Sequence, residues 1–137
     1  MNTIVRNILA VIAGLAVGST VNMGIIMVSG SIVSPPAGVD LSDAESLKSA
    51  MHLFGPINFL MPFLAHALGT FAGALVAALI AGSHKMTFAL VIGAFFLIGG
   101  AMMVFMLPSP LWFSVVDLAL AYFPMAWLGG KIGIRKV

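Results

Sequence analysis

The chain has no cysteine and very few charged residues. Among its 137 residues, Asp, Glu, Lys and Arg together make up only 7%. The absence of cysteine excludes disulfide bonds, thiol redox chemistry and thiolate metal sites. The scarcity of charge excludes a soluble fold, because about a quarter of the residues in a soluble domain are charged. Apolar residues make up 61% of the chain, so most of its surface must face lipid.

Four apolar runs account for most of the sequence. Each is long enough to cross about 30 Å of hydrocarbon as a helix that rises about 1.5 Å per residue. Because the runs are continuously apolar and do not alternate, they favour helices over a barrel. The runs cover residues 8–28, 57–81, 86–107 and 111–129. We therefore predict one all-α integral membrane domain with four transmembrane helices, surrounded by membrane lipid.

The first run has some features of a secretory signal peptide. Arg6 precedes it, and Ala16, Val17 and Gly18 resemble a cleavage site. However, the apolar run continues for about ten residues beyond Gly18, which makes it longer than the apolar region of a signal peptide. We therefore expect this segment to be retained as the first span.

Charged residues are divided unequally between the two sides of the predicted bundle. Five of the six Lys and Arg residues fall on one side, namely Arg6, Lys85, Lys131, Arg135 and Lys136. The other side carries the acidic residues and only one lysine. The positive-inside rule therefore predicts cytoplasmic N- and C-termini in a bacterial-type inner (plasma) membrane. The basic residues form no run, so no nucleic-acid partner is expected.

The longest segment between spans, residues 30–55, is predicted to lie outside the cell. Ser42 and Glu45 fit a capping box, with Ser42 as the N-cap. Apolar residues follow at helical spacing, which predicts a short amphipathic helix over residues 43–54. Glu45 and His52 would share one face of this helix, so both are candidate outer-loop functional residues.

Polar residues within the spans are the main functional candidates, because polar groups are costly in hydrocarbon. They are Asn22 in the first span, Asn58 and His66 in the second, and Asp117 in the fourth. Counted from the outer ends of the spans, Asn22 and Asp117 lie about 10 Å deep and His66 about 15 Å deep. We predict an outward-facing polar cavity floored by His66, in which these residues bind a solute or ion or relay protons. The competing interpretation is that they only join helices by hydrogen bonds.

Small residues recur every four positions on two of the predicted helices. This spacing lets the backbones of neighbouring helices approach closely, and it offers interfaces for a homo-oligomer. The predicted packing residues are Gly14, Gly18, Ala65, Gly69 and Gly73.

Prolines and aromatic residues add two further expectations. Pro62 and Pro124 lie inside the second and fourth apolar runs, and each is predicted to free a carbonyl of the preceding turn. Pro62 is also predicted to kink its helix. Trp112, Tyr122 and Trp127 are candidates for the aromatic belts at the membrane interfaces.

Three classes of function remain open. The first is an oligomeric transporter or channel subunit for a small solute or ion, with Asp117 and His66 at its centre. The second is a membrane-embedded enzyme that acts on a lipid or isoprenoid, and the third is an accessory or assembly protein. There is no nucleophile–base motif and no zinc-ligand spacing such as HxxxH. We therefore assign no catalytic residue, metal or cofactor, and we favour the first class over the second.

Overall fold

The computed structural model describes residues 1–136, which form helices joined by short loops, without strands. Four helical segments are long and apolar enough to span a membrane: Thr3–Ile32, Pro56–Ile80, Lys85–Met106 and Leu111–Arg135. The chain is therefore a multi-pass membrane protein. The first span is longer at both ends than the predicted residues 8–28, because polar end residues continue the helix; Asn2 caps its start by accepting from the Ile4 N–H.

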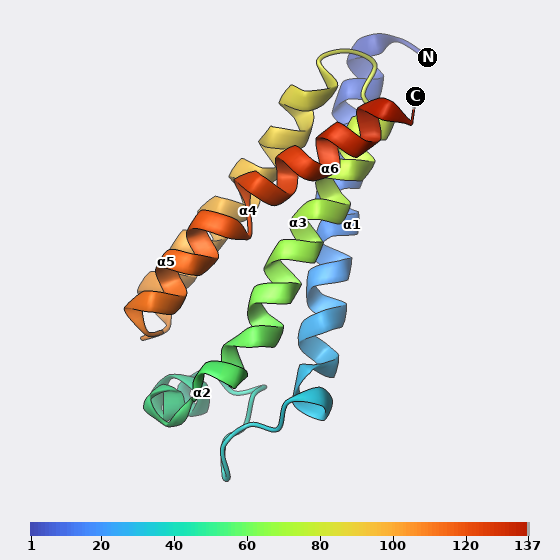
Figure 1. Ribbon diagram of the computed structural model, residues 1–137. Helices are drawn as coiled ribbons and strands as arrows, with labels where there is room; N and C mark the ends of the chain where they lie inside the picture. The colour runs from blue at the N-terminus through green and yellow to red at the C-terminus, as the bar shows by residue number, and fades with distance from the viewer. Residues whose placement is uncertain (137) are drawn as a thin grey trace.

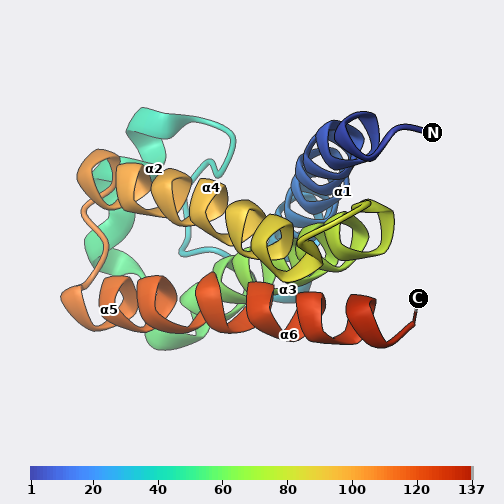
Figure 2. The ribbon, with the colours of Figure 1, turned by 90° about the horizontal axis from the view of Figure 1, so that it is seen from above.

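The central helix of the bundle is α3, which contacts α1, α4 and α6 (Figure 1). Viewed from above, α3 lies between α1 and α6 (Figure 2). In chain order the elements are α1 (Thr3–Ile32), α2 (Ala44–Ala50), the 3-10 helices η1 (Met51–Leu53) and η2 (Pro56–Phe59), α3 (Leu60–Ile80), α4 (Lys85–Met106), α5 (Leu111–Leu120) and α6 (Phe123–Arg135). The remaining spanning element, α5, packs mainly against α4 and α6.

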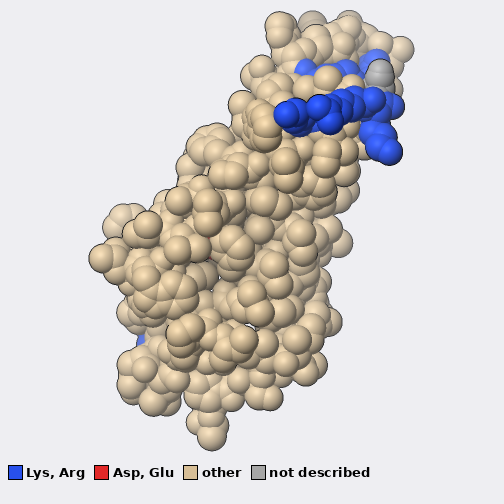
Figure 3. Space-filling view, viewed as in Figure 1, with Lys and Arg blue, Asp and Glu red and all other residues tan. Residues whose placement is uncertain are grey.

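Both termini lie at one end of the bundle, and α2 lies at the other (Figure 1). We call these the terminal end and the loop end. Basic side chains gather at the terminal end (Figure 3). Two of them meet the last carbonyls of α3: Arg6 Nε donates to Ile80 at 3.1 Å, and Lys85 Nζ donates to Ala78 at 3.2 Å. These contacts satisfy carbonyls that the helix end leaves free and complement its partial negative charge.

Glycines bring the backbones of α1 and α3 into direct contact. A Cβ atom added to Gly14 would lie 2.8 Å from the Gly73 carbonyl oxygen. One added to Gly18 would lie 2.8 Å from the Gly69 carbonyl oxygen. Larger residues cannot adopt this approach, so the small-residue faces of the two helices meet each other. Ala65, one turn further toward the loop end of α3, is fully buried.

A second glycine contact, which the sequence analysis did not identify, joins α6 to α3 and α4. A Cβ on Gly129 would lie 2.5 Å from the Phe71 carbonyl oxygen of α3, and one on Gly130 would lie 2.7 Å from the Ala89 Cβ of α4. The terminal half of the bundle is consequently filled by small side chains around one isoleucine. This buried core consists of Ala10, Ala74, Ala77, Ala78, Ala81, Ala89, Ile92 and Ala126.

The helix in the loop differs from the predicted one. It is shorter than residues 43–54, because α2 ends at Ala50 and a 3-10 turn follows. Its N-cap is Asp43 and not Ser42; the Asp43 carboxylate accepts from the Ser46 N–H at 3.1 Å. The Ser42 hydroxyl instead donates to Asp40 at 2.6 Å. This bond, together with one from the Ser42 N–H, holds the pKa of Asp40 below its usual value.

Pro62 also has a different role from the predicted one. It is the third residue of α3, which follows the 3-10 helix η2 directly. Amides in the first turn of a helix have no partner within that helix, so a proline costs little there. Pro62 therefore belongs to the start of α3 and is not a kink within it.

Candidate functional site

The fourth span is broken between α5 and α6. Pro124 is the second residue of α6 and has no N–H with which to continue the hydrogen bonds of α5. Tyr122, at the break, has φ −112° and ψ −80°, which are not helical values. Five residues along a continuous helix turn through about 500°, so Asp117 and Tyr122 would point about 140° apart. The break removes this restriction.

Asp117, His66 and Tyr122 form a hydrogen-bonded cluster. The Tyr122 hydroxyl donates to Asp117 Oδ2 at 3.0 Å, and His66 Nδ1 lies 2.8 Å from Asp117 Oδ1. The rings of His66 and Tyr122 are stacked, with centroids 5.9 Å apart and an angle of 25° between the planes. Asp117 is only 4% exposed, so these two contacts supply hydrogen bonds that water cannot. The structure thus brings together two predicted site residues that lie 51 positions apart in the sequence.

The cluster determines which nitrogen of His66 is available to a ligand. In the tautomer that pairs with an ionised carboxylate, which only accepts hydrogen bonds, Nδ1 carries the proton. The other ring nitrogen, Nε2, is then an acceptor. The His66 side chain is 24% exposed, whereas that of Asp117 is 6% exposed. His66 is therefore the member of the pair that can meet a ligand, and Asp117 orients it from behind.

A cavity of about 300 Å³ lies beside this cluster. Its polar lining comes from Asn22 of α1, His66 and Thr70 of α3, and Tyr122. Phe96 and Met103 of α4 supply most of the apolar lining, together with two adjacent glycines of the same helix. The cavity reaches Thr70, one turn nearer the terminal end than His66, so the predicted floor at His66 was one turn too shallow.

Thr70 carries an unpaired polar group into this cavity. The residue is only 1% exposed, and its Oγ1 has no hydrogen-bond partner among residues 1–136. Threonine hydroxyls within helices commonly bond back to a carbonyl of the preceding turn, and this one does not. Because buried polar atoms are nearly always paired, this hydroxyl is free to bond a water or a ligand in the cavity.

Gly100 creates the space that the Tyr122 ring occupies. A Cβ atom on Gly100 would collide with the hydroxyl of Tyr122 and would lie 2.6 Å from the Cζ of its ring. The neighbouring Gly99 is exposed, and a Cβ atom added there would meet nothing within 4 Å. The two adjacent glycines therefore differ: Gly100 accommodates the cluster, and Gly99 lies on the open side of the cavity.

The other predicted site residues lie away from the cavity. Asn58 connects the loop to the start of α3: its Oδ1 accepts from the Gly55 N–H at 2.9 Å and its Nδ2 donates to the Ser34 carbonyl at 3.2 Å. Glu45 and His52 are exposed residues of α2 and η1 at the loop end. Within the described part of the chain, no group of three His, Asp or Glu side chains is arranged to hold a metal ion.

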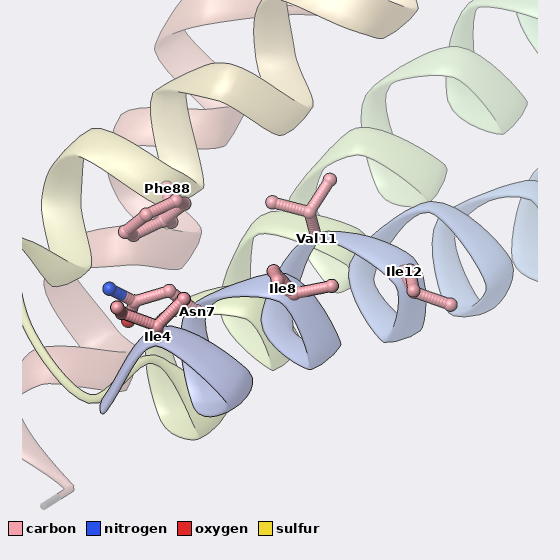
Figure 4. Close-up of a pocket in the computed structure, with 6 residues that line it drawn as sticks. All are labelled: Ile4, Asn7, Ile8, Val11, Ile12 and Phe88. Carbon is pink, nitrogen blue, oxygen red and sulfur yellow. The ribbon is translucent and has the colours of Figure 1, made fainter. Parts of the chain in front are cut away.

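A larger groove of about 480 Å³ lies between α1 and α4 at the terminal end (Figure 4). Asn7 is its polar lining residue, and its side chain is already used: it accepts from the Gly82 N–H at 2.9 Å and donates to Ser83 Oγ at 3.0 Å. The remaining lining is apolar, formed by Ile4, Ile8, Val11, Ile12 and Phe88. The groove offers a ligand no free polar group, so it suits a lipid chain better than a polar solute.

Tyr122 corrects an interpretation made from the sequence. It was expected in an interfacial aromatic belt, but it is only 2% exposed and its hydroxyl meets Asp117. Trp112 and Trp127, in contrast, are 48% and 46% exposed. The feature of the sequence that could have predicted this contact is Pro124, two residues after Tyr122. A proline interrupts the helix, and the interruption turns the Tyr122 side chain toward Asp117.

No family model and no curated protein matches this sequence, and no solved structure matches this fold. The proposed function therefore rests on the geometry of the candidate site.

Proposed function

We propose that the protein is a small transporter or channel subunit of a bacterial-type inner (plasma) membrane, and that it binds a small solute or ion in the cavity beside His66. The observation that carries this proposal is the unpaired Thr70 hydroxyl. It borders a cavity that also contains an imidazole held in one orientation by a buried carboxylate. Ionisable groups within spans typically belong to ion, proton or substrate pathways.

The cavity is closed by packed residues on its terminal side, which supports a carrier. On the terminal side, Ile92 is fully buried and its Cδ1 would lie 2.9 Å from a Cβ atom on Gly14. Ile92 is one helical turn from Phe96, which lines the cavity, so the alanine and glycine core begins directly beneath it. A site closed on one side and open on the other is one state of alternating access. With both termini in the cytoplasm, as the basic residues favour, the closed side faces the cytoplasm. Gly99 and Met103 leave the cavity exposed along α4.

We further propose that the protein acts as a homo-oligomer through the exposed face of α1. Thr20 is exposed, and Gly24 is exposed with nothing within 4 Å of an added Cβ. A glycine in a helix facing only lipid is unfavourable by about 1 kcal/mol, which a closely packed second helix would offset.

Crosslinking tests this interface. The chain contains no cysteine, so Gly24→Cys introduces a single thiol. Oxidation in native membranes should yield a disulfide-linked dimer, whereas the same substitution at Met106 should not. Equal crosslinking at both positions would contradict this interface.

Flux measurements test the proposed transport. Purified protein is reconstituted into liposomes, and four probes are followed: protons with a trapped pH-sensitive dye, and labelled methylammonium, rubidium and acetate by filtration. Liposomes containing Asp117→Asn are the matched control, because the substitution keeps the side-chain shape and removes the charge. Wild-type protein should carry at least one probe faster than the variant. If none of the four fluxes differs, and Asp117→Asn changes only stability, the polar cluster merely joins helices and the accessory interpretation holds.

The His66–Asp117 contact also favours a second candidate function, a membrane-embedded enzyme acting on a lipid or isoprenoid. An imidazole that lines a cavity and is oriented by a carboxylate through Nδ1 is suited to act as a general base. Gly99 and Met103 expose the cavity wall on α4, from which a lipid could enter. Incubation with phospholipid and with a polyprenyl phosphate, followed by mass spectrometry, tests this candidate. Conversion by wild type but not by Asp117→Asn would establish it.

A further inference from the structure

We propose that the ligand of the cavity is a primary ammonium group, R–NH₃⁺, which donates hydrogen bonds to His66 Nε2 and to the Thr70 hydroxyl. This inference rests on the proposed function in so far as it takes the cavity to be the solute site. It adds the chemical class of the ligand and the atoms that recognise it.

The polar lining favours a hydrogen-bond donor. His66 Nε2 is an acceptor, because Nδ1 is directed at Asp117. Thr70 Oγ1 is unpaired, and Asn22, whose carboxamide can accept as well as donate, lines the cavity on the α1 side. These groups present acceptors from two helices, and an R–NH₃⁺ group carries three N–H donors. An alcohol would offer only one.

The charge of the site favours a cation over an anion. The residues that line the cavity include no Lys or Arg, and five of the six basic residues of the chain lie at the terminal end. Asp117 lies directly behind His66, 2.8 Å away. An anion would therefore be desolvated without a counter-charge, whereas a cation meets the field of a buried carboxylate.

The apolar lining sets the size and shape of the ligand. Phe96 and Tyr122 present aromatic surface to the cavity, and Met103 presents a thioether. Aromatic faces attract cations and also cover short alkyl groups. A volume of about 300 Å³ is at the small end of ligand cavities, so it suits an amine of a few carbons with some water. The same group can arrive as a free amine or as the headgroup of an aminolipid such as phosphatidylethanolamine.

The decisive variant is Thr70→Val, which exchanges the unpaired hydroxyl for a methyl group of nearly the same shape. Replacing a buried polar atom that has no partner is neutral or stabilising, so this variant should fold. Its matched control is Thr87→Val on α4, because Thr87 is exposed near the terminal end and does not line the cavity. A change in binding that appears in the first variant and not in the second is due to the cavity.

Calorimetric titration of the purified protein with methylammonium, tetramethylammonium and acetate tests the assignment. Methylammonium should bind wild type and Thr87→Val equally, and Thr70→Val about tenfold more weakly. Tetramethylammonium, a cation without N–H donors, and acetate, an anion, should each bind wild type at least about tenfold more weakly than methylammonium. Absence of methylammonium binding, equal binding by Thr70→Val, or a preference for tetramethylammonium or acetate would overturn the proposal.

Two further arms separate the related claims. Titration in phosphatidylcholine nanodiscs, with and without phosphatidylethanolamine, identifies the source of the ammonium group. Competition by the aminolipid assigns the site to a lipid headgroup, and the absence of competition assigns it to a free amine.

The flux assay distinguishes the proposed ligand class from the proposed transport function. If methylammonium binds with the stated selectivity but no probe is carried, the ligand class stands and transport falls. If protons or rubidium are carried but methylammonium does not bind, transport stands and the ligand class falls.

Discussion

The Tyr122 hydroxyl donates a hydrogen bond to Asp117 Oδ2 at 3.0 Å, although the two residues lie five positions apart in the same span. A continuous helix would keep them on different faces, so the break between α5 and α6 is what joins them. Asp117 in turn orients His66, and His66 and Tyr122 both line the cavity. The local disruption by Pro124 is thus linked directly to the geometry of the candidate site.

Removing the Tyr122 hydroxyl should destabilise the protein while leaving the ring in place. Tyr122→Phe leaves one oxygen of a buried carboxylate without its donor, which typically costs about 1–3 kcal/mol. Thermal unfolding in detergent should show this loss, and the stack on His66 should persist in the ring-current shifts of His66. A variant as stable as wild type would show that the Asp117 contact contributes nothing to the fold.

The role of Pro124 can be tested with a double-mutant cycle. Pro124→Ala restores an N–H and allows α5 to continue into α6, which should move Tyr122 away from Asp117. In that background, Tyr122→Phe should have almost no further effect on unfolding, because the hydrogen bond is already lost. If the two substitutions are instead additive, the hydrogen bond does not depend on the break.

Two adjacent glycines on α4 provide a matched pair. Gly100→Ala would place a Cβ atom on the Tyr122 hydroxyl and should cost about 1–3 kcal/mol through overpacking. Gly99→Ala adds its Cβ to open space and should be neutral, or stabilising by up to about 1 kcal/mol through helix propensity. Equal effects of the two substitutions on the free energy of unfolding would contradict the described position of the Tyr122 ring.

The orientation in the membrane is testable because the chain has no cysteine. His84→Cys, in the turn between α3 and α4, should react with a membrane-impermeant maleimide only after the cells are opened. Glu45→Cys, on α2, should react in intact cells. The reverse pattern would place the termini outside and turn the cavity toward the cytoplasm.

Composition and spacing were sufficient to predict the membrane class and the location of the four spans, because lipid imposes long apolar helices. Gly14 and Gly18 lie opposite Gly73 and Gly69, and these predicted packing residues bring the backbones of α1 and α3 into direct contact. Residue depths also placed Asp117 near His66, and the two are in hydrogen-bonding contact. These features depend on local periodicity, which a single sequence contains.

The remaining features depend on departures from ideal helices, and these are harder to infer. Tyr122 joins the cluster only because the span breaks, and the sequence analysis had placed it in an interfacial aromatic belt. Asn58 was placed by depth alone, but its side chain is held by Ser34 and Gly55, contacts set by an irregular loop. Thr70 lies one helical turn from His66 on α3, and its lack of a partner is visible only once the neighbouring helices are in place.

Nitrogen-15 NMR of protein labelled at histidine tests the central claim most directly, with His66→Gln used to assign the signals. The account predicts that His66 carries its proton on Nδ1, with Nε2 unprotonated and free to accept. Addition of methylammonium should shift the Nε2 resonance of His66 and leave those of His52 and His84 unchanged. A proton on Nε2, or a His66 resonance that does not move at saturating methylammonium, would contradict the proposed site.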